Sequence, residues 1–183
     1  MGERLKLHPD SSSSAVEHIE VTARRHANNL LLCYLVSGMI GEVRMPDVVA
    51  PARSDELWRH TCFEAFVRAS PGSAYYEFNF APSTQWAAYR FSGYRNGMCK
   101  ASEIGAPAIE IQSEPGRYTL RASLKLDRSP DLPRSALWRL GLAAVIEDTS
   151  GSKSYWALAH PTGKPDFHQA ACFTLELSPS VPP

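Results

Sequence analysis

Alternation of apolar and polar side chains is complete in Arg117-Tyr-Thr-Leu-Arg-Ala-Ser-Leu-Lys-Leu-Asp127. A period of two places successive side chains on opposite faces of a β-strand. The stretch therefore predicts a strand with one buried face and one face in water.

The same period recurs along the chain, and two more continuously apolar runs are typical of central strands. The strands predicted in this way cover residues 17–25, 30–36, 63–68, 76–80, 85–91, 108–113, 117–127, 140–146, 155–159 and 173–177. About ten short strands, with turn signals between them and little helix, predict an all-β antiparallel sandwich or barrel.

Length and charge narrow the class of protein. The chain has 183 residues, and nineteen basic side chains balance nineteen acidic ones. We expect a flexible N-terminal segment over residues 1–15, a single domain over residues 16–177, and a frayed tail over residues 178–183. A net charge of zero argues against nucleic-acid partners, which require a basic surplus, and against anionic membranes.

Cysteine usage and the first residues bear on the compartment. Cys33, Cys62, Cys99 and Cys172 form no CxxC pair, so neither a zinc ribbon nor a thioredoxin-like motif is indicated. The chain starts without an apolar leader region, and no apolar run approaches the ~18 residues that span a bilayer. These features predict a cytoplasmic protein with reduced thiols.

Two residues stand out around the strand at 63–68. Trp58 precedes this strand, where loops commonly present binding residues. Glu64 faces away from Phe63 and Ala65, and a carboxylate covered there needs a donor partner. The alternative is structural: Trp58 closes the core, and Glu64 pairs with an arginine.

A second group of candidates comes from the next two strands. Glu77 and Asn79 share one face of their strand, and Arg90 lies on the following strand. Carboxylate, amide and guanidinium groups beside flat rings are typical of sugar sites, where they bind hydroxyls while the rings stack on the sugar. An ordinary polar outer face explains the alternation equally well.

A third group follows the strand at 155–159. Trp156 and His160 have the same parity, and His168 lies further along the loop. The histidine spacing matches neither H-x-x-x-H nor H-x-H and lacks a third ligand, so a metal site is not predicted. His160 or His168 together with Met98 could be axial haem ligands if two loops converge.

Common enzyme motifs are missing from the sequence. It has no G-x-S-x-G, no G-x-G-x-x-G and no P-loop. Glu64 and Glu77 could be imagined as a glycosidase pair, but strand parity does not bring them together. We predict no catalytic residue and leave an enzyme open, because convergent sites need no motif.

The order of these segments resembles a known superfamily. Leu57-Trp58, Phe63-Glu-Ala-Phe66 and Tyr75-Tyr-Glu-Phe-Asn-Phe-Ala-Pro82 resemble the DOMON and family 9 carbohydrate-binding module superfamily. The blocks at 155–160, 165–168 and 173–177 resemble a bacterial DOMON-like branch, some members of which carry the label of an unrelated cell-wall reductase, MurB. The resemblance covers roughly residues 16–177.

The resemblance implies a jelly-roll-like sandwich that binds a sugar or a haem. In sugar-binding members two aromatic rings clamp a terminal sugar, and acidic, amide and arginine side chains bind its hydroxyls. Trp58 and Glu64 match the first ring and the acid, Arg90 matches the arginine more loosely, and Trp156 is the candidate second ring.

The leading hypothesis is a non-catalytic module for a small ligand, most naturally a carbohydrate. Its predicted ligand-binding residues are Trp58, Glu64, Glu77, Asn79, Arg90, Trp156, His160 and His168. The alternatives are a haem-binding electron-transfer or sensor domain and a protein-interaction module. The sequence does not specify the oligomeric state.

Overall fold

Twelve strands and three short 3-10 helices form the regular structure of residues 2–179, the part of the chain that the computed structural model describes. The strands are β1 (Glu3–Leu7), β2 (Val16–His26), β3 (Asn29–Gly38), β4 (Cys62–Ser70), β5 (Tyr75–Phe80), β6 (Trp86–Phe91), β7 (Cys99–Lys100), β8 (Ala108–Glu114), β9 (Arg117–Lys125), β10 (Leu137–Glu147), β11 (Lys153–Ala157) and β12 (Leu175–Leu177). The helices are η1 (Ile40–Glu42), η2 (Leu57–Arg59) and η3 (Ala170–Cys172). No helix in this part of the chain is long and apolar enough to cross a membrane.

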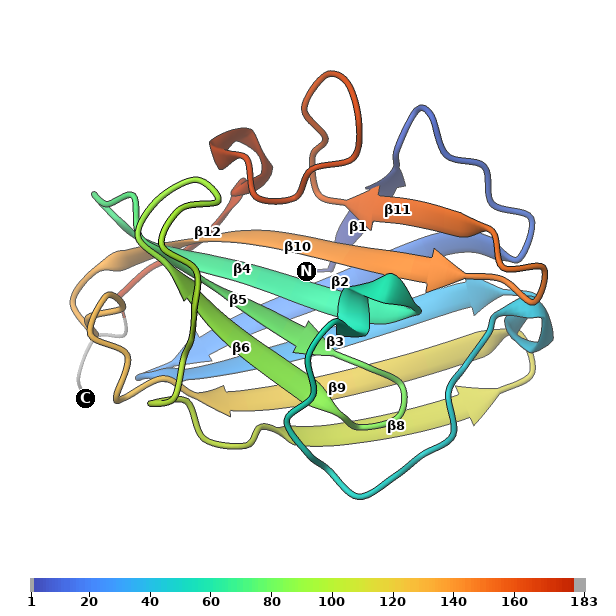
Figure 1. Ribbon diagram of the computed structural model, residues 1–183, viewed down its shortest axis with the longest axis horizontal. Helices are drawn as coiled ribbons and strands as arrows, with labels where there is room; N and C mark the ends of the chain where they lie inside the picture. Colours follow the sequence, from blue (N-terminus) through green and yellow to red (C-terminus); the bar gives the residue numbers. More distant parts are fainter. Residues whose placement is uncertain (1, 180–183) are drawn as a thin grey trace.

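The strands form one curled antiparallel sheet whose halves face each other, as Figure 1 shows. Its order is β7-β6-β5-β4-β10-β11-β1-β2-β3-β9-β8, with β12 also paired to β10. The short strand β1 joins the halves, because Glu3 to Leu5 pair with β2 whereas Lys6 and Leu7 pair with β11. The all-β antiparallel prediction is confirmed.

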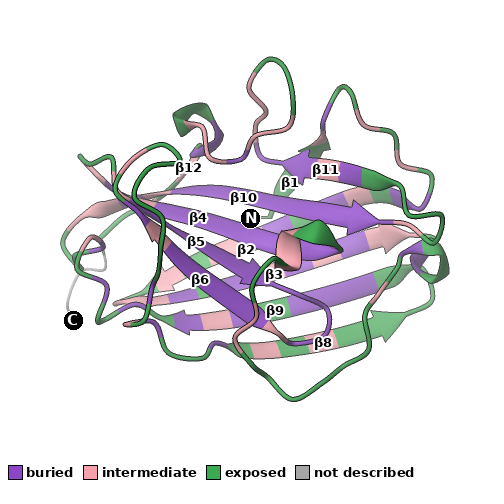
Figure 2. Cartoon of the chain, in the orientation of Figure 1, coloured by how far each residue is buried: buried purple, intermediate pink, exposed green. Residues whose placement is uncertain are grey.

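The main core lies between the two halves. Tyr34 of β3, Phe63 of β4, Phe78 of β5 and Trp138 of β10 all point into it and are fully buried. The half formed by β4, β5, β6 and β10 is also covered on its outer face, so these strands are buried almost throughout in Figure 2. Outer-edge strand β8 is mostly exposed. The molecule therefore has one half-sheet whose second face is closed off from water.

The segment predicted to be flexible contains a strand. Residues 3–7 form β1, which pairs with β2 and β11, and Leu5 is buried in the core. The sequence pattern of five residues was too short to indicate this strand. The predicted frayed tail at 178–183 lies mostly outside the described residues, which end at residue 179.

Candidate functional site

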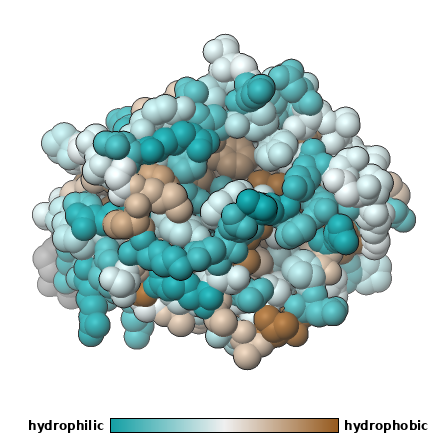
Figure 3. Space-filling view, viewed as in Figure 1, coloured by the Kyte–Doolittle hydropathy of each residue, from teal (hydrophilic) through white to brown (hydrophobic). Residues whose placement is uncertain are grey.

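A cavity of about 460 Å³ lies on the outer face of the covered half-sheet. Its floor comes from β4, β5 and β10, and its walls come from η2, the β6–β7 loop, β11 and the segment between β11 and η3. In Figure 3 hydrophobic atoms are visible in a recess that is surrounded largely by hydrophilic ones. Small-ligand sites are commonly concave, mostly apolar and of about 300–1,000 Å³, so this cavity has the dimensions of one.

Strand register assembles the polar floor. Glu64 of β4 lies directly opposite Asn79 of β5, and Phe66 lies opposite Glu77. Because side chains two residues apart share a face, Glu64, Glu77 and Asn79 all project to the outer side of the half-sheet. Asn79 Nδ2 donates a hydrogen bond to Glu77 Oε1 at 2.8 Å. The structure thus brings together three of the predicted residues.

Glu64 is a buried acid without a partner. Glu64 is 3 % exposed and lines the cavity. Its Oε1 atom makes no hydrogen bond within residues 2–179. Burial raises the pKa of Glu64 well above its usual range, and the nearby Glu77 carboxylate raises it further, against an opposing effect of Arg95. A buried polar atom without a partner is costly, and a ligand donor would remove that cost.

Glu77 is partly satisfied. Burial raises its pKa to about 7, although the hydrogen bond from Asn79 and the charge of Arg95 both act in the opposite direction. Its second oxygen, Oε2, lies 3.7 Å from His168 Nε2. The Glu77 carboxyl is therefore held in the pH range where a ligand can change its protonation.

His168 is held by the Tyr75 hydroxyl. The backbone N–H of Arg95 donates to the Tyr75 hydroxyl oxygen at 3.2 Å, and His168 Nδ1 lies 2.8 Å from the same oxygen. In the tautomer in which Tyr75 donates to Nδ1, His168 carries its proton on Nε2, toward Glu77. Burial, aided by the charge of Arg95, lowers the pKa of His168 to about 4, and the ring is neutral at pH 7.

Asp166 ties together the two loops that form one wall. Its carboxylate accepts hydrogen bonds from the guanidinium of Arg95 at 2.8 Å, from the hydroxyl of Tyr94 at 2.5 Å and from the backbone N–H of His168 at 3.2 Å. Arg95 and Tyr94 belong to the β6–β7 loop, whereas Asp166 belongs to the β11–η3 segment. This contact holds the wall in place across the cavity mouth.

Trp58 lies on η2, which begins after Glu56 in a left-handed conformation with φ of 61°. Its ring packs edge-on against Tyr89 of β6, with centroids 5.9 Å apart. The Tyr89 hydroxyl donates to Asp55 at 2.8 Å, which fixes that ring in turn. Trp58 is partly exposed and lines the cavity, as a stacking residue would.

Three predicted residues lie elsewhere. Arg90 projects from the same face as Tyr76, opposite to Glu77, and its Nε donates to Asp131 at 2.5 Å. Trp156 is 4 % exposed within the main core. His160 Nε2 lies 2.7 Å from the Lys6 carbonyl oxygen and does not line the cavity. Each is explained by its structural contacts.

The sequence reasoning missed several lining residues. Tyr155 and Phe167 contribute aromatic surface, and Arg95 and Asp166 contribute charge. Tyr155 is the immediate neighbour of Trp156, and Asp166 and Phe167 lie in the same block as His168. Closeness in the sequence to predicted residues was the signal that could have identified these three. Arg95 lies in a loop without a periodic pattern, so the sequence offered no signal for it.

Two of the residues offered as haem ligands lie at the same cavity. His168 and Met98 both line the cavity, but Nδ1 of His168 is engaged by Tyr75 and Nε2 faces Glu77. These contacts do not fit a histidine that is free to ligate iron. Within residues 2–179 no group of three or more His, Cys, Asp or Glu side chains is arranged to hold a metal ion.

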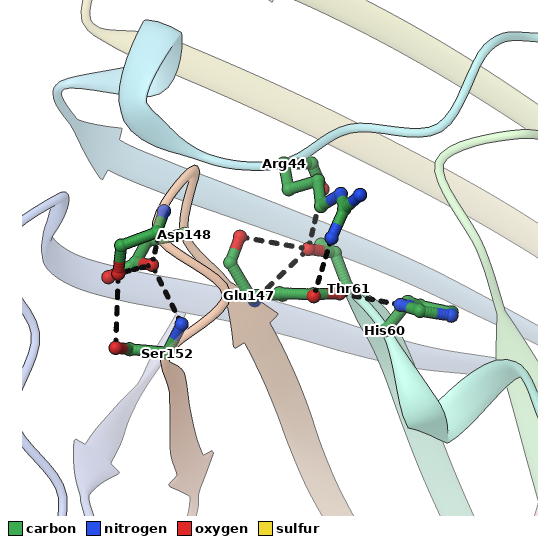
Figure 4. Close-up of polar contacts among 7 residues, drawn as sticks. Arg44, His60, Thr61, Glu147, Asp148 and Ser152 are labelled. Atoms are coloured by element: carbon green, nitrogen blue, oxygen red, sulfur yellow. Dashed lines mark hydrogen bonds and ion pairs between the residues drawn. The ribbon is translucent and has the colours of Figure 1, made fainter.

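A polar cluster at the end of β10 provides an internal comparison (Figure 4). Glu147 is also buried, but its carboxylate contacts Arg44 Nη1 at 3.1 Å and His60 Nδ1 at 2.6 Å. Although burial favours a higher value, these hydrogen bonds lower the pKa of Glu147. The buried carboxylate of Glu147 thus has hydrogen-bond partners within the chain, as a structural role requires. The Oε1 atom of Glu64 has no such partner within residues 2–179.

Comparisons with known proteins show the fold. No family model and no curated protein matches the sequence. A candidate carbohydrate-binding protein from Bacteroides uniformis is similar in structure, with a TM-score of 0.64 and 16 % identity over 86 % of this chain and 76 % of that one. A family 9 carbohydrate-binding module from Caldicellulosiruptor kristjanssonii, solved with cellotriose, gives a TM-score of 0.56 and 12 % identity over 97 % of this chain and 81 % of that one. The chain thus has the fold of these two β-sandwich proteins.

Proposed function

We propose that this chain is a non-catalytic carbohydrate-binding module and that the sugar occupies the cavity above Glu64 and Glu77. The observation that carries the proposal is the unpartnered Oε1 of the buried Glu64, at the floor of a solvent-connected cavity of about 460 Å³. A sugar hydroxyl provides the donor or acceptor that this atom requires.

The walls suit a sugar ring. Trp58 comes from η2 and Tyr155 comes from β11. Phe167 comes from the segment between β11 and η3. Flat rings cover the apolar face of a sugar, while Glu77 and Arg95 supply fixed polar groups. Asn79 is fully buried outside the lining and holds Glu77 in place. In this assignment Tyr155 or Phe167 is the second stacking ring, the role that the sequence analysis predicted for Trp156.

The two structural neighbours support the same ligand class. One is described as a candidate carbohydrate-binding protein, and the other was solved with cellotriose. We further propose that the chain belongs to the DOMON-like branch of that superfamily. The four cysteines are free, which supports a reducing compartment such as the cytoplasm.

The proposal is tested by isothermal titration calorimetry against neutral monosaccharides and oligosaccharides, including glucose and cello-oligosaccharides. We expect saturable heat with at least one of them. A parallel titration with haem tests the alternative, and we expect no shift of the haem Soret band. Absence of heat with every sugar would contradict the proposal. A Soret shift that His168→Ala abolishes would replace it with haem binding.

A further inference from the structure

We propose that the preferred sugar carries a primary ammonium group and that this group binds between the carboxylates of Glu64 and Glu77. The inference rests on the proposed carbohydrate function and names a ligand class within it. It follows from how charge is distributed between the floor and the mouth of the cavity.

The floor carries acids that no fixed cation neutralises. Glu64 and Glu77 form no ion pair with Lys or Arg among residues 2–179, where every such pair is with another acid. Arg95 is the cation that acts on both of them, but its guanidinium is paired with Asp166 at 2.8 Å. Once a ligand cation ionises both floor carboxyls, this group holds three acids against one arginine.

The histidine beside the floor does not supply the missing charge. His168 contacts the Tyr75 hydroxyl at Nδ1 and is neutral at pH 7, so its Nε2, 3.7 Å from Glu77, brings no positive charge to the floor. The amide of Asn79 is neutral too, and it already donates to Glu77. A cation from the ligand is the complement that the floor lacks.

Apart from Arg95, the cations that line the cavity are Arg59 and Lys153, and both lie at its mouth. Arg59 has a 64 % exposed side chain and pairs with Glu56, and Lys153 is exposed at the start of β11. Water and salt screen exposed charges, whereas they screen buried ones much less. A ligand cation therefore gains more from the buried acids than it loses to the basic groups at the mouth.

The unpartnered oxygen selects a hydrogen-bond donor as well as a charge. A primary ammonium has three N–H donors, and Glu64 Oε1 makes no hydrogen bond. Charge-assisted hydrogen bonds are roughly twice as strong as neutral ones. A quaternary ammonium has no N–H, so it would leave Glu64 Oε1 unpartnered.

The experiment is calorimetry of the full chain at pH 7 with glucose, N-acetylglucosamine, glucosamine and choline. We expect glucosamine to bind roughly tenfold more tightly or better than the two neutral sugars, as one additional charge-assisted contact would give. Its heat should also depend on the ionisation enthalpy of the buffer, because ammonium binding displaces a proton from the floor carboxyls. The neutral sugars should show no such dependence.

The outcomes separate this inference from the proposed function. Glucose or N-acetylglucosamine binding as tightly as glucosamine would overturn the inference and leave the carbohydrate function standing. Choline binding as tightly as glucosamine would also overturn it, because the quaternary nitrogen of choline has no N–H to donate. Absence of binding by all four ligands would overturn both the inference and the function for this class of sugar.

Variants test whether the preference for glucosamine arises from the two floor carboxyls. Glu64→Gln should weaken glucosamine binding more than neutral-sugar binding and so remove most of the preference, and Glu77→Gln should reduce the preference in the same way. Glu114→Gln, on the exposed strand β8 of the other half-sheet, is the matched control and should keep the full preference. Unchanged preference in both Glu64→Gln and Glu77→Gln would overturn the inference, and circular dichroism melts establish that each variant is folded.

Discussion

At the residue scale, three buried glutamates show how the surroundings determine a carboxyl group. Glu147 receives hydrogen bonds from Arg44 and His60 and has a lowered pKa, whereas burial raises the pKa of Glu77 to about 7. Glu64 has a raised pKa and an oxygen without any partner. Because groups with strongly raised pKa values concentrate at functional sites, Glu64 and Glu77 support the proposed assignment of the cavity as the ligand site.

The raised pKa of Glu77 predicts a specific pH dependence of stability. Between its ordinary value near 4.5 and its folded value of about 7, the folded state binds a proton that the unfolded state has lost. Its contribution to the free energy of unfolding is thus complete below pH 4.5 and falls as pH rises to 7, by on the order of 3 kcal/mol. His168, with a pKa lowered to about 4, has the opposite effect between pH 4 and 6.5, where stability rises with pH.

Urea denaturation at pH 5 and pH 7.5 measures this balance. Relative to the wild type, Glu77→Gln should lose less stability, or gain some, on going from pH 5 to pH 7.5, because glutamine does not titrate. Glu114→Gln, which is exposed on β8, controls for the loss of a charge alone. Identical pH dependence in the wild type and Glu77→Gln would show that Glu77 ionises normally.

At the element scale, β10 and η3 approach so closely that a glycine is required. A Cβ atom at Gly141 would lie 3.2 Å from the carbonyl oxygen of Cys172, the last residue of η3. The segment that leads into η3 carries Asp166, Phe167 and His168 into the cavity wall. The small residue in β10 therefore sets how closely this wall rests on the half-sheet.

Gly141→Ala should destabilise the protein by about 1–3 kcal/mol, because the contact is with backbone that has to move. Hydrogen exchange in residues 165–172 should increase at the same time. Gly105→Ala is the matched control, since a Cβ there would meet nothing within 4 Å. Equal unfolding free energies for the two variants would contradict the proposed close approach.

The elements were largely predictable because their signal is local. The period of two in residues 117–127 and the apolar runs identified the strands, and strand β9 lies where the alternation indicated. The same parity correctly placed Glu77 and Asn79 on one face. Their burial was not predictable, since it depends on loops that come from distant parts of the chain.

Two predicted site residues lie on the other face of their strands for a common reason. Arg90 and Trp156 were each chosen one position away from a residue on the outer face, Tyr89 and Tyr155 respectively. On a strand covered on both sides, alternation separates the two faces but does not say which one carries the ligand. Which face carries the ligand site depends on the pairing of β6 with β5 and of β11 with β10. The local sequence does not encode that pairing.

At the scale of the whole molecule, the curled sheet has two apolar clusters with different roles. One fills the space between the halves, and the other lies on the outer face of β4, β5, β6 and β10 beneath the loops. The second cluster surrounds the acidic floor, and Trp58 packs against it. The fold can thus keep a stable core while the outer face forms a cavity for a ligand.

The central claim is that the ligand binds on this outer face, and calorimetry with the tightest-binding sugar tests it most directly. Trp58→Ala should weaken binding by about 1–3 kcal/mol, because it removes a stacking ring. Arg90→Ala should leave the affinity unchanged, since Arg90 projects from the opposite face and pairs with Asp131. Unchanged affinity in Trp58→Ala together with lost affinity in Arg90→Ala would place the ligand elsewhere and contradict the account.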